Sequence, residues 1–290
     1  MMRSSCCWKI GKEDGRIMKK ILSVCLVLIM VLSLTGGGSN PAVEIMKNAQ
    51  DQTAAIENFE AETVISMAVR IGGIENAVKM TTNAVIFTNP KKMKICMSDG
   101  AESTEMLVLQ EDDASHVYIR ESGEWVEWTL SNTRLSQLDA QQNMAFYLNL
   151  VDESVTFSKV AEEILNGQET YYFDMEVPPE ISRKIFQMAD MEEQLAAMRD
   201  LSRVRGDLSS NIGSLTIRMW YDKTTGYPLQ YEIDMTDIMR AMYEQMFQAM
   251  IEWRGWAPED LEISLTECIL TMTYSNYNSA EDFELPVVAE

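Results

Sequence analysis

Histidine is almost absent from the chain, because His116 is the only one in 290 residues. Catalytic triads that use histidine and zinc sites with several histidines are therefore excluded. Glycine-rich phosphate loops, the GxSxG serine turn and CxxC cysteine pairs are also missing after residue 37. Without these motifs, we predict a protein that is not an enzyme and that holds no metal and no cofactor. We expect His116 to be a half-exposed strand residue rather than a ligand.

Basic residues are also scarce. The chain has 24 Lys and Arg against 45 Asp and Glu, which gives a formal net charge of -21. Six of the basic residues but only two of the acidic ones lie in the first 37 residues, so the rest of the chain carries -25. Such a surface repels phosphate backbones, and we predict no nucleic-acid partner. The same repulsion between copies predicts a soluble monomer.

No apolar run is long enough to favour a permanent transmembrane helix. The longest, Ile21–Leu34, has 14 residues and would rise about 21 Å as a helix, short of a ~30 Å hydrocarbon core. It follows Lys19 and Lys20 and precedes small residues, which is the order of a secretory signal peptide. We therefore predict export, with the body of the protein outside the cytoplasm, secreted or associated with the outer face of the cell membrane.

Residues 34–40 resemble the signal of a bacterial lipoprotein, but Gly37 stands at the position of the acylated cysteine. Glycine has no sulfur to carry a lipid, so lipidation is not expected at this position. Met18 precedes the two lysines and is an alternative start of the leader. The predicted organisation is a leader over residues 1–37, a Gly/Ser tether over 38–41 and one domain over 42–290.

Two cysteines lie outside the leader, Cys96 and Cys268. Outside the cytoplasm they could form a disulfide, although two distant cysteines do not make a disulfide framework. Two buried free thiols are the alternative. The sequence leaves this choice open.

The periodicity of apolar residues changes repeatedly along the body. Pro41 begins a stretch with helical spacing, and from Glu60 the period becomes two, with Ile65, Met67 and Val69 on one face. Helical spacing predicts helices over residues 41–58, 130–150, 180–202 and 237–254. Alternation predicts strands over residues 60–71, 78–86, 93–97, 106–110, 117–119, 125–129, 154–160, 170–177, 215–221, 229–235 and 262–277. Short turns join most strands, so we predict an α+β fold with an antiparallel sheet.

Three segments carry a resemblance to a known group of proteins. Trp220–Leu229, with the sequence WYDKTTGYPL, resembles the strand-turn-strand of the LolA-like lipoprotein carrier superfamily, which includes LolA, LolB, LppX and LprG. The segments Gly123–Val126 and Tyr274–Asn278 agree with uncharacterised Gram-positive lipoproteins of that group. The similarity extends over residues 41–286 and rests on turn chemistry and the order of elements.

The resemblance implies a strongly curved antiparallel sheet, an incomplete barrel, with helices on its concave side and a hydrophobic cavity between them. It also implies a role in carrying or sensing lipids or lipoproteins. On this basis we expect a non-catalytic envelope protein whose ligand is a lipid or an acylated partner. A membrane surface is a further candidate partner.

The candidate ligand-binding residues are apolar side chains from strands and from one methionine-rich helix. They are Ile65, Met67, Val69, Met80, Ile86, Met239, Met242 and Met246. Methionine adapts to irregular partners and would make a pliable wall. The alternatives are an ordinary amphipathic helix docked on the sheet and a copper(I) thioether site.

Two other functions remain open. An envelope interaction or sensor module would have a packed core and no lipid cargo, so an empty apolar pocket distinguishes it from a carrier. A hydrolase would require two inward carboxylates that flank a cleft.

Overall fold

The computed structural model describes residues 40–71, 73–111, 114–121, 123–131, 154–188, 212–244 and 263–286. The helices are α2 (Pro41–Thr53), α5 (Pro179–Met188) and a helical segment at residues 236–244. The first strands are β1 (Asn58–Ile71), β2 (Ile74–Thr88), β3 (Lys91–Ser98), β4 (Ser103–Gln110), β5 (Ala114–Glu121) and β6 (Glu124–Ser131). The later strands are β7 (Thr156–Phe157), β8 (Ala161–Leu165), β9 (Gln168–Val177), β10 (Leu215–Asp222), β11 (Pro228–Asp234) and β12 (Ile263–Ser275).

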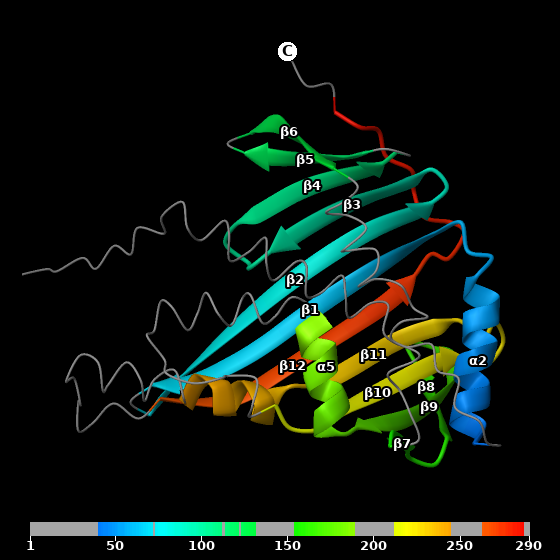
Figure 1. The fold of residues 1–290 in the computed structure, drawn as a ribbon, viewed down its shortest axis with the longest axis vertical. Coiled ribbons are helices and arrows are strands. Elements are labelled where there is room, and N and C mark those ends of the chain that lie inside the picture. Colours follow the sequence, from blue (N-terminus) through cyan, green and yellow to red (C-terminus); the bar gives the residue numbers. More distant parts are fainter. Residues whose placement is uncertain are drawn as a thin grey trace, which may run out of the picture.

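All twelve strands belong to one antiparallel sheet that does not close into a barrel (Figure 1). Its order is β6-β5-β4-β3-β2-β1-β12-β11-β10-β9-β7, and β8 pairs with β9 beside that path. The first and last long strands, β1 and β12, are neighbours in the middle of the sheet. The predicted α+β fold with a curved antiparallel sheet is thus confirmed.

The two faces of the sheet differ in chemistry because the strands alternate. We call the side that carries Leu270 and Met272 the inner face, and the other side the outer face. On the outer face Arg218 lies between two acidic residues, 2.8 Å from Asp174 and 3.7 Å from Glu232. Helix α5 lies in front of the sheet in Figure 1, on the inner face.

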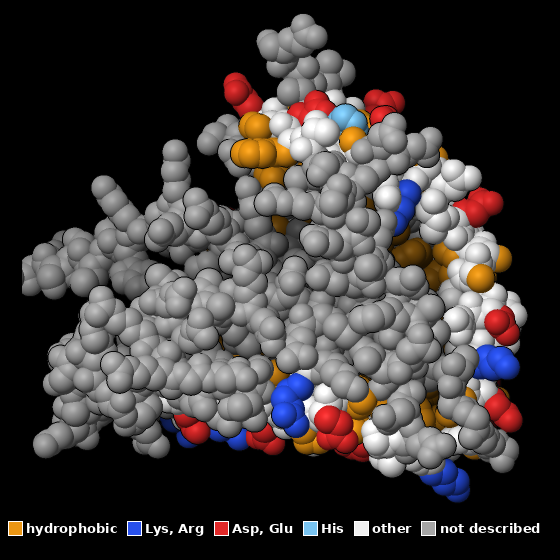
Figure 2. All heavy atoms as spheres, viewed as in Figure 1, with side chains coloured by type: hydrophobic (Ala, Val, Ile, Leu, Met, Phe, Trp, Pro, Cys, Tyr) orange, Lys and Arg blue, Asp and Glu red, His pale blue; other side chains and the backbone are white. Residues whose placement is uncertain are grey.

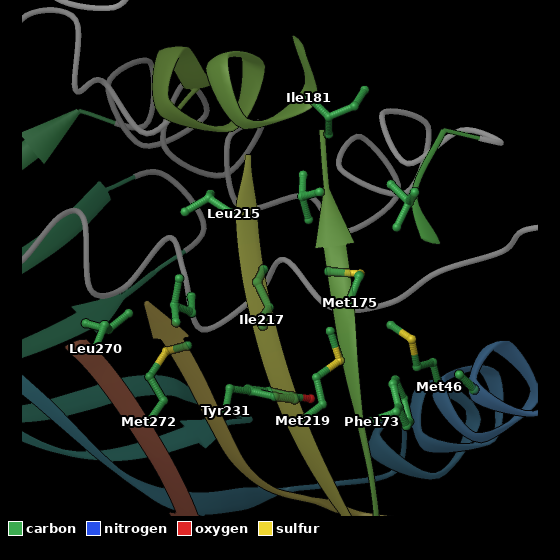
Figure 3. Close-up of a cluster of buried hydrophobic side chains, with 14 of the residues drawn as sticks. Met46, Phe173, Met175, Ile181, Leu215, Ile217, Met219, Tyr231, Leu270 and Met272 are labelled. Atoms are coloured by element: carbon green, nitrogen blue, oxygen red, sulfur yellow. The ribbon is translucent and has the colours of Figure 1, made fainter. Parts of the chain in front are cut away.

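The inner face of β9 to β12 forms a tightly packed core (Figure 3). Met46 of α2, Ile181 of α5 and Met242 of segment 236–244 each bury their side chains in it. The strand residues of this core include Phe173, Met175, Leu215, Ile217, Met219, Tyr231, Ile233, Leu270 and Met272. Helices therefore cover one half of the inner face and stabilise it by apolar burial.

The predicted helices and strands match the structure in part. Helix α2 begins as expected at Pro41, where the Asn40 Oδ1 accepts a hydrogen bond of 3.0 Å from the Ala42 N–H. The predicted helix over 130–150 lies outside the described residues, apart from its first two, which end β6. The later parts of the helices over 180–202 and 237–254 also lie outside them, as does the leader with Gly37. No helix among the described residues is long and apolar enough to span a membrane.

The strand predicted over 154–160 is present as β7 but is shorter than expected, and the strand that follows it was missed. The chain forms β7 there and then a separate strand, β8, which pairs with β9 across the turn at Asn166 and Gly167. The adjacent Glu162 and Glu163 interrupt the apolar alternation, which hid β8 in the sequence.

The two cysteines of the body do not pair. Both are free, and the sheet register separates them, since Cys268 lies opposite Met67 on the inner face and Cys96 lies opposite Asn83 on the outer face. Burial raises the pKa of both thiols, that of Cys268 to about 11. The alternative of two free thiols is therefore the one that the structure supports.

The turn between β10 and β11 fits the hairpin motif noted in the sequence. The Asp222 carboxylate accepts hydrogen bonds from the Thr224 N–H at 2.8 Å and the Thr225 hydroxyl at 3.0 Å. Gly226 completes the turn with φ of +75°. A Cβ at this glycine would lie 2.7 Å from the Nδ2 of Asn48, so the turn also packs closely against α2.

Gly226→Ala is expected to lower the free energy of unfolding by about 2 kcal/mol, from left-handed strain plus displacement of Asn48. Gly100→Ala is the matched control, because Gly100 has φ of +89° but open space where a Cβ would lie. Its cost should be about half as large, since only the strain remains. Urea denaturation of both variants measures the difference, and equal costs would show that the contact with α2 is unimportant.

Candidate hydrophobic ligand site

The inner face of β2 to β6 carries an almost unbroken set of apolar side chains. Cross-strand pairs connect them across the sheet: Ala84 lies opposite Ile95, Ile95 opposite Met106, and Met106 opposite Ile119. We call this set the β2–β6 apolar surface. Its residues are Val78, Met80, Ala84, Ile86, Met93, Ile95, Met97, Met106, Val108, Val117, Ile119, Val126 and Trp128.

This surface is less completely buried than the core over β9 to β12. Met80, Ile86 and Met93 are half-buried, and Val78 and Trp128 are 46% and 53% exposed. At its centre, Ala84 of β2 and Ile95 and Met97 of β3 form a small buried cluster, and Met106 of β4 packs against it. The cluster thus contains no helical residue among those described, in contrast to the core over β9 to β12.

Figure 2 shows the molecule from the side on which α5 lies. Hydrophobic side chains are visible toward the top of this view, in the region of β5 and β6 in Figure 1. The cross-strand register shows which residues share the inner face. Charged residues at inner-face positions of β2 to β6 occur only at strand ends, as Lys91, Glu121 and Glu124. The apolar surface is therefore suited to an uncharged or hydrocarbon ligand.

Two of the predicted strand residues are members of the β2–β6 apolar surface, and two more adjoin it. Met80 and Ile86 belong to it, and Ile65 and Met67 of β1 lie opposite Met80 and Val78. Val69 follows a bulge in the pairing of β1 with β12 and is half-buried.

The predicted helix methionines lie toward the other half of the inner face. Met242 is only 3% exposed and belongs to the core over β9 to β12, while Met239 packs at its margin. Met246 lies outside the described residues. The nearest link between this helix and the candidate strands is the Tyr243 hydroxyl, 3.9 Å from the Met67 sulfur.

Sequence reasoning missed most of the surface. Met93, Met97, Met106, Val108 and Val126 were seen only as members of alternating strands, because alternation does not tell which of two faces is shared by neighbouring strands. The cross-strand register supplies that information.

One buried polar atom faces this half of the sheet without a partner. Ser115 is fully buried and occupies an inner-face position of β5, opposite Gln110. Its hydroxyl is the only buried side-chain N or O atom, among the described residues, that makes no hydrogen bond. Such a group normally has a partner, so this hydroxyl is available to a ligand or to water.

The outer face of the same strands is polar and ion-paired. Lys94 and Arg120 contact Glu105 at 3.1 and 3.5 Å, and the Nδ1 of His116 lies 2.6 Å from Glu127. This placement fits the expected half-exposed strand histidine, and no cluster of metal-ligating residues occurs in the described part of the chain. The outer face is therefore mixed, because Val85, Leu107 and Leu109 also lie on it, and Leu107 is only 3% exposed.

No family model and no curated protein matches the sequence. Similar solved structures include the lipoprotein LppX from Mycobacterium tuberculosis, with 13% identity and a TM-score of 0.45, covering 83% of this chain and 97% of that one. LprF from Mycobacterium bovis has 10% identity and a TM-score of 0.41, with 84% and 95% covered. A LolA-superfamily protein from Nitrosomonas europaea has 9% identity and a TM-score of 0.25, with 84% and 94% covered. The identities are low and the TM-scores are below 0.5, so a likeness at this level says nothing about the ligand.

Proposed function

We propose that this is a non-catalytic protein of the cell envelope that binds a lipid or an acylated partner outside the cytoplasm. The observation that carries the proposal is the β2–β6 apolar surface, which is large, half-buried and free of charge except at strand ends. The leader, with Lys19 and Lys20 before an apolar run, supports export.

Apolar burial supplies the binding energy in this proposal. Each Å² of apolar surface removed from water contributes about 25 cal/mol, so a ligand that covers several half-buried side chains gains several kcal/mol before the cost of association. Met80, Met93 and Met106 suit this task because the flexible thioether side chain adapts to ligands of irregular shape.

The Ser115 hydroxyl supports a ligand that also carries an oxygen acceptor. A hydroxyl can donate one hydrogen bond, and an ester or acid carbonyl is the acceptor that acyl lipids provide. This arrangement favours an acyl lipid over a pure hydrocarbon.

Native mass spectrometry tests the proposal on protein purified from an exporting host, before and after extraction with organic solvent. We expect a bound mass that extraction removes and that fragments as an acyl lipid. The second candidate, an interaction module with a filled core, is favoured by Ile95, which is only 1% exposed. A bare protein mass that persists when envelope lipids are added would contradict lipid binding and support that module.

A further inference from the structure

Strand β2 extends well beyond its neighbour β3 and leaves an open sheet edge. Pairing with β3 begins at Thr81, opposite Ser98, whereas pairing with β1 continues to Ile74, opposite Ile71. Figure 1 shows the β1–β2 hairpin projecting past the end of β3. Residues 74–79 are all exposed. We call residues 74–80 the β2 edge.

The direction of the backbone groups on the β2 edge follows from one hydrogen bond. The Thr88 N–H donates to the Glu57 carbonyl at 2.8 Å, on the side of β1, and the β1–β2 register is continuous from there to the turn. In an antiparallel ladder alternate residues point to opposite neighbours. The N–H and C=O groups of Glu75, Ala77 and Lys79 therefore point away from β1, toward the open side.

Charged residues on an edge strand usually prevent pairing with other chains. On the β2 edge they have an unusual order, with Glu75 and Lys79 placed symmetrically about Ala77. If two copies pair antiparallel about a two-fold axis at Ala77, Glu75 of each copy lies directly opposite Lys79 of the other. This register also uses every outward N–H and C=O group of these three residues.

The same register covers exposed apolar side chains on the inner side of the edge. Ile74 is 68% exposed and would lie opposite Met80 of the second copy, while Val78, 46% exposed, would lie opposite Asn76. Opposite charges and apolar pairs at facing positions both stabilise antiparallel strands. Lys79 makes no ion pair with any described residue, so it is available for this contact.

From these observations we propose that two copies of this chain associate through their β2 edges, in the register centred on Ala77. The net charge of -25 over residues 38–290 predicts a monomer. Charge repulsion is screened beyond about 8 Å at physiological salt, however, whereas the edge contact is local. The contact is small compared with a standard interface of about 1,600 Å², so we expect a dimer with a dissociation constant of about 0.1 mM. Ligand binding is not required for it, and the two proposals can fail separately.

Charge exchange tests the register. Sedimentation equilibrium in about 0.15 M salt is expected to show a monomer–dimer equilibrium of the protein purified from an exporting host. Glu75→Lys and Lys79→Glu should each weaken it at least about tenfold, because like charges then face each other. The double variant E75K/K79E should restore it, and a mixture of the two single variants should form a mixed dimer.

Several outcomes would overturn the proposal. A wild-type protein that stays monomeric at about 0.5 mM would do so, since a dimer of the expected strength would then be mostly formed. If Glu75→Lys weakened the dimer but Lys79→Glu did not, the cause would be loss of the 3.2 Å ion pair between Glu75 and Arg70, and the register would be wrong. A monomer that floats with phosphatidylcholine vesicles would assign Ile74 and Val78 to a membrane surface. Thermal melting of each variant checks that these exposed substitutions leave the fold intact.

Discussion

Met80→Glu is expected to weaken the binding of phenylnaphthylamine, a neutral apolar probe, by more than about a hundredfold. Met80 is half-buried on the inner face, so the new carboxylate is hydrated in the free protein but covered when a ligand lies on the β2–β6 apolar surface. Removing an unpaired charge from water costs about 3 kcal/mol or more, which corresponds to that loss of affinity. Probe fluorescence measured against protein concentration gives the dissociation constants.

Thr81→Glu is the matched control for this experiment. Thr81 is the next residue along β2, is also half-buried, and lies on the outer face opposite Ser98. The substitution adds the same charge at almost the same place in the chain, so probe affinity should stay within about threefold of the wild type. Equal losses in the two variants would mean that the probe does not bind to the inner face.

The second large effect is alkaline unfolding. Tyr221, Tyr231, Tyr274 and Tyr277 lie together at the end of the core over β9 to β12, where burial raises the pKa of each hydroxyl well above its ordinary value near 10. The folded protein keeps these protons to higher pH than the unfolded chain does. Their contribution to stability is therefore complete below about pH 10 and is lost as pH rises above it.

For each of these tyrosines, the free energy of unfolding is expected to fall by about 1.4 kcal/mol per pH unit above pH 10. The four together should lower it by more than about 5 kcal/mol per pH unit. Cys268 acts in the same direction above pH 9, because its pKa is raised to about 11. Urea denaturation at pH 9 and pH 11 measures the loss. Tyr221→Phe removes one titrating group and should reduce the slope by about 1.4 kcal/mol per pH unit. Equal stability at the two pH values would contradict the burial of these hydroxyls.

Alternation in the sequence predicted the strands well because one face of nearly every strand is apolar. It placed Ile65 and Met67 on one face of their strand, and the structure pairs them with Met80 and Val78 of the next strand. It did not show that Met93 and Met106 extend the same surface, since that depends on register across two turns.

The sequence also did not predict that the inner face is tightly packed over β9 to β12 and only half-buried over β2 to β6. Met242 and Met80 look alike in an apolar pattern, yet Met242 is enclosed by the core over β9 to β12 and Met80 is not. The difference arises from where the helices cross the sheet. Helix periodicity gives the apolar side of a helix but not the strands on which that side rests.

The pairing of β1 with β12 has a consequence for how the chain folds as it emerges. Strands β1 to β6 follow one another by short connections, so their pairs are local and can form early. Strand β12 joins them to β9–β11 by pairing with β1. This pairing places Glu60 opposite Ser275, more than two hundred positions away in the chain. Until the last strand arrives, β1 and β11 both have unpaired edges that invite misassociation. The two halves of the sheet can therefore join only after the chain has been made as far as residue 275.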